Sequence, residues 1–189
     1  MKPRMKLRIL AFALLPTITL FGWLGFAQKA ETPTKPKLAI SIKPKDMADA
    51  LHAVIGSDRE VYTKLSAQRA QEKGVLNPCE LFRLNSEAVA SKGVEFSYVL
   101  RALRPINQRN APETEVEKKG LEFVSTHASQ AYSEEELLGG RWYFTAVYAD
   151  VAVNESCVTC HNQLKDSPRK DFKRGDVMGG VVVRVALEL

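Results

Sequence analysis

The sequence predicts an α+β domain with an antiparallel sheet. Segments with helical periodicity come first in the chain, and segments with strand character cluster later. No strand–helix–strand alternation and no internal repeat is visible, and this order favours separate helical and strand layers over a parallel sheet. The length of 189 residues fits one domain with a targeting segment.

The two N-terminal helices are predicted from an apolar stripe and from start signals. Residues 47–71 place apolar side chains on one face, with Asp46 as a candidate cap and Gly56-Ser57 as a candidate break. The segment Asn77-Pro78-Cys79-Glu80 combines a capping Asn, a Pro at the first helical position and an early Glu. This second helix is expected to run to Ala90.

Strands are predicted around a third helix in the rest of the domain. They are expected at residues 94–103, 141–153 and 177–189, the middle segment forming one long strand or two. The third helix is expected at residues 113–128. Loops or turns are expected at the following segments: 104–112, Gly139-Gly140, 165–173 and Gly175-Asp176.

Residues 1–27 have the features of a membrane-targeting segment. Basic residues in the first eight positions precede an apolar stretch that ends at Ala27. This is the pattern of a signal peptide with a small-residue cleavage site. The stretch also suits an uncleaved anchor, for which about 18 apolar residues are enough. Both interpretations place the remaining chain outside the cytoplasm.

Residues 28–44 are predicted to be a linker, because prolines alternate there with polar residues, and the folded domain is expected at residues 45–189. The net charge of +5 is moderate and partly belongs to the N-terminal segment. A basic run at residues 165–174 is either a docking patch for an acidic partner or a solvated loop. Aromatic residues do not interleave with the basic ones, which argues against nucleic-acid binding.

The segment Cys157-Val158-Thr159-Cys160-His161 matches the C-x-x-C-H signature of c-type haem attachment. The two thiols add to the two haem vinyl groups, and the next residue, His161, is placed to bind the iron. A zinc site needs two further ligands in a suitable pattern, and the other Cys and His residues are scattered. A redox Cys pair would sit in an α/β fold. The motif therefore predicts one covalent haem c, and the export signal agrees because bacteria attach haem outside the cytoplasm.

A second axial ligand is left open by the residues alone. The candidates are Cys79, His52, His127, Met47 and Met178. Cys79 is the odd cysteine of an exported chain and lies near a helix N-terminus, where a thiolate is favoured. The alternatives are a buried inert thiol for Cys79, surface or helix-face positions for the histidines, and core positions for the methionines.

Several segments together resemble one family of c-type haem domains. They are Asn77-Pro78-Cys79, residues 101–112 with Glu117 and the helix around it, Tyr143-Phe144, the haem motif, and residues 174–180. The chain resembles the PAS-like c-type haem domains that occur alone in cyanobacteria and as extracytoplasmic sensors of histidine kinases. The resemblance covers most of residues 45–189. It implies a PAS-like fold and axial ligation by His161 and Cys79.

The loop at residues 104–112 departs from that family, since Ile106 and Gln108 stand where its members tend to have Arg or Pro. The departure leaves open which basic residue meets the haem propionates. Arg101, Arg104 and Arg109 are the candidates, because carboxylates prefer planar guanidinium partners, and ordinary surface arginines are the alternative.

Two functions follow as hypotheses. The first is a sensor of redox state or of a diatomic gas, in which reduction or an arriving ligand displaces Cys79 and shifts its helix. No output domain follows the last strand, so we expect such a sensor to act through a signalling partner. The second is a low-potential electron-transfer cytochrome with a redox partner. An enzyme is not expected. The location is expected to be periplasmic, or lumenal in a cyanobacterium, with a membrane contact through residues 7–27.

Overall fold

The structure is a computed structural model that describes residues 42–69 and 73–187. The predicted targeting segment, 1–27, and most of the predicted linker lie outside the described residues. No helix within the described part of the chain is long and apolar enough to cross a bilayer.

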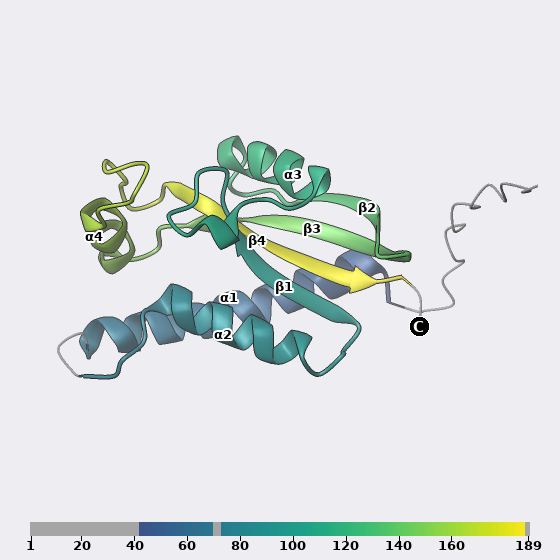
Figure 1. Cartoon of the computed structure of the whole chain (residues 1–189), viewed down its shortest axis with the longest axis horizontal. Coiled ribbons are helices and arrows are strands. Elements are labelled where there is room, and N and C mark those ends of the chain that lie inside the picture. Colours follow the sequence, from purple (N-terminus) through teal and green to yellow (C-terminus); the bar gives the residue numbers. More distant parts are fainter. Residues whose placement is uncertain (1–41, 70–72, 188–189) are drawn as a thin grey trace, which may run out of the picture. The chain divides into compact units, whose positions relative to one another are not determined.

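A four-stranded antiparallel sheet forms the centre of the domain, in the order β1-β4-β3-β2 (Figure 1). The strands are β1 (Phe96–Arg101), β2 (Tyr132–Leu138), β3 (Arg141–Val151) and β4 (Val177–Ala186). A tight turn at Gly139-Gly140 joins β2 to β3, and both glycines have positive φ. The predicted α+β class with an antiparallel sheet is confirmed.

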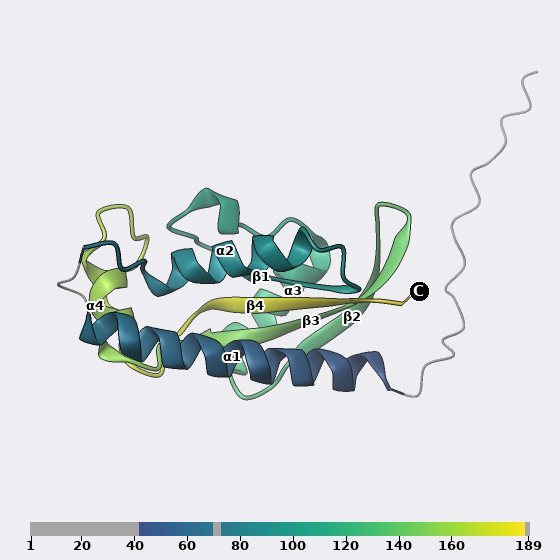
Figure 2. The same cartoon turned by 90° about the horizontal axis from the view of Figure 1, so that it is seen from below.

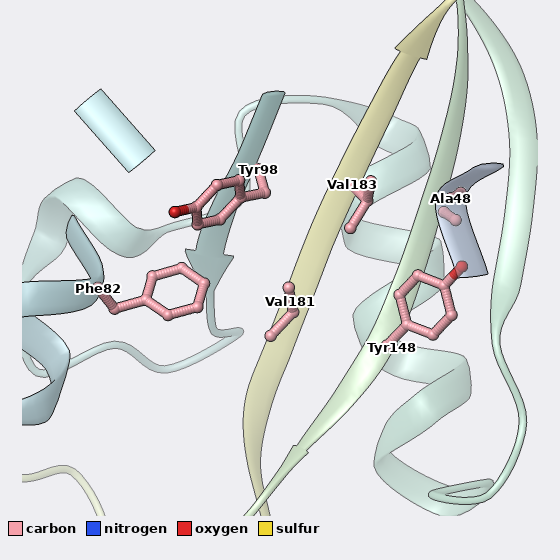
Figure 3. Close-up of a cluster of buried hydrophobic side chains, with 7 residues drawn as sticks. Ala48, Phe82, Tyr98, Tyr148, Val181 and Val183 are labelled. Atoms are coloured by element: carbon pink, nitrogen blue, oxygen red, sulfur yellow. The ribbon is translucent and has the colours of Figure 1, made fainter. Parts of the chain in front are cut away.

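Helices cover both faces of this sheet. Helices α1 (Pro44–Gln68) and α2 (Pro78–Ala90) lie on one face, and α3 (Glu115–Thr126) lies on the other (Figures 1 and 2). Strand β4 contributes side chains to the hydrophobic cores on both faces of the sheet, because successive strand residues point to opposite faces. Val181 and Val183 pack with Phe82 and Tyr98 on the α1–α2 side, as Figure 3 shows, whereas Val182 packs towards α3.

The start of α2 agrees with the sequence prediction, and the start of α1 differs. Asn77 caps α2 by accepting a hydrogen bond from the Glu80 N–H at 2.8 Å. Helix α1 begins three residues earlier than expected, at Pro44, and Asp46 lies inside its first turn and not at the cap. The ring of a Pro fixes its φ angle at a helical value. The N–H that Pro lacks would have no partner at the first helical position, so its absence costs nothing there. Gly56-Ser57 does not interrupt the helix.

Strand β2 is absent from the sequence prediction, which also leaves open whether one or two strands follow Gly140. Strand β2 contains Glu134-Glu135-Glu136, a run that resembles an exposed loop. Glu136 is nevertheless buried, and its carboxylate accepts hydrogen bonds from Thr145 and Arg184 at 2.6 and 3.1 Å. The next segment is one long strand, β3, which pairs with both β2 and β4.

Helix α3 packs closely against the sheet at Gly120, whereas Gly56 of α1 faces open space. A Cβ on Gly120 of α3 would overlap Val147 Cγ2 of β3 and lie 2.7 Å from Val147 Cβ, whereas a Cβ on Gly56 of α1 would meet open space. We expect Gly120→Ala to lower the free energy of unfolding by about 1–3 kcal/mol through overpacking. The matched change Gly56→Ala should raise it by about 0.4–1 kcal/mol, because alanine restricts the unfolded chain. Urea unfolding followed by circular dichroism measures both, and an equal gain for both variants would contradict the close packing of α3.

Candidate haem site

The C-x-x-C-H motif forms a short helix, α4 (Glu155–Gln163), beyond the end of the sheet and near the start of α2 (Figures 1 and 2). Asn154 caps it by accepting a hydrogen bond from the Ser156 N–H at 2.7 Å. Residues three and four apart lie on the same side of a helix. Cys157, Cys160 and His161 therefore share one side of α4.

The segment after α4 holds His161 in place. The side chain of Asn162 donates to the Phe172 carbonyl and accepts from the Phe172 N–H, each at 3.0 Å. The Phe172 ring meets the His161 ring edge-on, with centroids 5.7 Å apart, and the Arg169 guanidinium lies 4.4 Å from the Phe172 centroid. Burial lowers the pKa of His161. A lower pKa favours the neutral imidazole, which is the form that binds a metal.

Cys79 lies in the first turn of α2, and its environment differs from the sequence expectation. The preceding segment is tied to α1 by the Tyr62 hydroxyl, which donates to the Leu76 carbonyl at 3.0 Å. Burial raises the pKa of the Cys79 thiol to about 11, with a further increase from Asp150 and a decrease from Arg59. The helix N-terminus alone was expected to favour the thiolate. Cys79 is exposed and lines a cavity, yet the surrounding protein removes enough water from the thiol to make burial the largest cause of its raised pKa.

A cavity of about 650 Å³ brings these elements together. Cys79 of α2 and Cys160 and His161 of α4 all line it. Its walls also include many apolar side chains, among them Phe82, Leu100, Ile106, Leu164, Phe172 and Met178. This volume lies within the roughly 300–1,000 Å³ of typical ligand sites. A large apolar wall with thiols, an imidazole and nearby cations suits a flat, mainly apolar cofactor with carboxylate groups, so these residues fit a haem.

The three candidate arginines all line this cavity but differ in their partners. The Arg101 side chain is buried and donates to the Glu117 carboxylate at 3.1 Å and to the Arg109 carbonyl at 2.8 Å, and it pairs with Glu113 at 2.6 Å. Arg104 and Arg109 are exposed, and no hydrogen bond or ion pair joins either guanidinium to another described residue. The donors of Arg104 and Arg109 are therefore available to a propionate, whereas those of Arg101 already hold the loop to α3.

Of the other candidate iron ligands, one lies at the cavity and three do not. Met178, which the sequence analysis weighed as a core residue, lines the cavity. His52 stacks on Tyr148 of β3 with ring centroids 3.9 Å apart, and His127 stacks on Phe123 at the end of α3. His52, His127 and Met47 are not among the described residues that line the cavity. Within residues 42–69 and 73–187, no group of three or more His, Cys, Asp and Glu side chains converges as ligands of a bare metal ion.

Sequence reasoning missed a charged pair at the same cavity. Asp150, near the end of β3, is buried, lines the cavity and pairs with Arg59 of α1. Both guanidinium ends of Arg59 bond the two carboxylate oxygens, one of these bonds measuring 3.1 Å between Nη2 and Oδ2. No local pattern signals this pair, because its members are far apart in the sequence and each belongs to an otherwise ordinary helix or strand.

Comparisons with known proteins agree with this fold. The model of the Tll0287-like family matches residues 37–186. A crystal structure described as that of the cyanobacterial heme-protein Tll0287 superposes with a TM-score of 0.50 and 18% sequence identity, covering 77% of this chain and 97% of the other. At that identity the superposition shows a common PAS-like α+β fold. No curated protein matches the chain significantly. Because the family model spans most of the sequence, this chain belongs to the Tll0287-like family.

Proposed function

We propose that this chain is an exported c-type haem protein with one covalent haem. The observation that carries the proposal is the cavity in which Cys79 from α2 meets Cys160 and His161 from α4. These residues belong to different segments, and the fold gathers them beside a large apolar wall. The structurally similar Tll0287 is itself described as a heme-protein, which supports the same cofactor here.

Each residue has a distinct proposed role. Cys157 and Cys160 anchor the cofactor as thioethers, His161 and Cys79 bind the iron from α4 and α2, and Arg104 and Arg109 hold the propionates. Bound haem would supply one-electron chemistry and, if Cys79 were displaced, a site for a diatomic gas. The proposed activity is exchange of an electron or a ligand and not turnover of a substrate.

We propose sensing of redox state or of a diatomic gas as the function. Cys79 is carried by α2, which packs on β1 through Phe82 and Tyr98, whose ring centroids lie 5.2 Å apart in a T-shaped pair. If Cys79 were released from the iron, the first turn of α2 would lose that attachment, and the aromatic contact would carry the change to the sheet. A signalling partner would then read the new position of α2. Export by residues 1–27 belongs to the same proposal.

Electron transfer to a redox partner is the second candidate. The exposed arginines Arg104 and Arg109 lie at the cavity, and Lys165, Lys170 and Lys173 follow α4 nearby in the sequence and are exposed. A basic surface beside a redox centre favours an acidic partner and speeds its association at low ionic strength.

Covalent attachment is the first test of the proposed function. We expect the full chain, expressed with a c-type maturation system, to retain haem on a denaturing gel and after acid–acetone extraction. Cys157→Ser together with Cys160→Ser should remove all covalent haem, because no thioether can form. Cys79→Ser, the matched control, should keep it, because Cys79 is proposed as an axial ligand only. Haem that is extracted from the wild-type chain would contradict c-type attachment.

A further inference from the structure

We propose that the ion pair of Arg59 and Asp150 sets the electrostatic environment of the Cys79 sulfur and thereby the reduction potential of the site. Arg59 acts as a positioning residue with an unused hydrogen-bond donor for the ligated sulfur, and Asp150 holds it there. The inference rests on the proposed function, since it concerns Cys79 as an iron ligand.

The pair lies where three elements meet. Arg59 extends from α1 to Asp150 of β3, and its guanidinium carbon is 6.0 Å from the ring centroid of Phe82. Phe82 lies one turn after Cys79 on α2 and lines the cavity with it. Only 8% of the Asp150 surface is exposed. Asp150 therefore shares the cavity with Cys79, and the Arg59 side chain, which is 20% exposed, pairs with it from α1.

Arg59 keeps one donor without a partner. Among the described residues, its Nε is the buried side-chain nitrogen or oxygen for which no hydrogen-bond partner exists. Buried donors are normally paired, so this unused N–H leaves Arg59 able to donate to an acceptor whose negative charge is present only when the haem is bound. A metal-bound thiolate is such an acceptor, and hydrogen bonds to ligating sulfur tune the potential of metal centres.

The two charges act on the iron in opposite directions. Fe(III) carries one more positive charge than Fe(II), so the Arg59 cation favours the reduced form and the Asp150 anion the oxidised form. A hydrogen bond from Arg59 also withdraws electron density from the sulfur, which again favours reduction. Removal of Arg59 should therefore lower the potential, and removal of the Asp150 charge should raise it.

Spectroelectrochemical titration of the holoprotein tests this. We expect Arg59→Gln to change the ratio of ferric to ferrous iron at a given potential by about tenfold, a fall of about 59 mV for one electron. Asp150→Asn should shift the potential upward, and Arg59→Lys, which keeps the charge, should lie between wild type and Arg59→Gln. Lys64→Gln removes an exposed charge from the same helix and is the control, with no expected shift. The ferric thiolate EPR signal should change in Arg59→Gln and stay unchanged in Lys64→Gln.

A purely structural pair predicts a different pattern. Loss of either partner would then lower stability and move the potential little, or move it in the same direction for both variants, and either result overturns the inference. Asp150→Asn preserves the shape of the side chain. If Arg59→Gln does not fold, the direction in which Asp150→Asn shifts the reduction potential decides between the two explanations. If wild-type spectra contain no thiolate signal, the ligand assignment on which the inference rests fails first, whereas a thiolate signal with equal potentials in all variants refutes the inference alone.

Discussion

Replacing Cys79 by serine is expected to abolish the ferric low-spin thiolate signals of the holoprotein. Serine keeps the size of the side chain and suits the first turn of α2, but its hydroxyl does not replace a thiolate as a ligand of ferric iron. Optical and EPR spectra of the oxidised and reduced protein measure the change. We also expect the variant to bind CO immediately on reduction, because one axial position no longer holds a protein sulfur.

The wild-type protein under the same conditions separates the two candidate functions. If Cys79 leaves the iron on reduction and CO then binds rapidly, the sensor hypothesis gains support. Retention of Cys79 in both oxidation states supports the electron carrier, which needs a stable ligand set. Spectra of Cys79→Ser that match those of wild type would refute the assignment of Cys79. Met178 would then be the first alternative to examine, since it lines the same cavity.

Glu117→Gln is expected to lower the free energy of unfolding at pH 7 by about 3–5 kcal/mol, as when one partner of a buried ion pair is removed. Glu117 is fully buried on α3 and accepts hydrogen bonds from Arg101 at 3.1 Å and Arg184 at 2.7 Å. Glutamine keeps the shape but leaves both guanidinium groups without this carboxylate. Urea unfolding followed by circular dichroism measures the loss, and Glu122→Gln, at an exposed position of the same helix, is the control.

The loss of unfolding free energy in Glu117→Gln should also become smaller at low pH. Burial opposes ionisation of Glu117, but the Glu113 N–H, Arg184 and Arg101 outweigh it and lower its pKa. A lowered pKa in the folded state gives stability that is present above the unfolded pKa of about 4.3 and is lost as the pH falls through the folded value. The difference between wild type and Glu117→Gln should therefore narrow below about pH 4. A difference that stays constant down to pH 3 would contradict a role for the charge.

The sequence alone determined the features that depend on near neighbours. The start of α2 follows from Asn77, Pro78 and Glu80, which satisfy or remove the unpaired N–H groups of a first helical turn. The spacing of Cys157, Cys160 and His161 likewise predicts a haem-binding motif without knowledge of any fold. The order of helices before strands was sufficient to predict the α+β class.

Only the tertiary structure decided which distant groups meet. Strand β2 was missed because its three successive glutamates resemble a loop until Thr145 and Arg184 are seen to pair with Glu136. Arg101 could not be separated from Arg104 and Arg109 by sequence, since all three share one segment and only the fold places Glu117 beside the first. Sequence also could not show that Cys79, Asp150 and His161 line one cavity, because they belong to three different elements. Hydrogen bonds and ion pairs between distant segments depend on strand pairing and helix packing, and local residue patterns do not encode these partners.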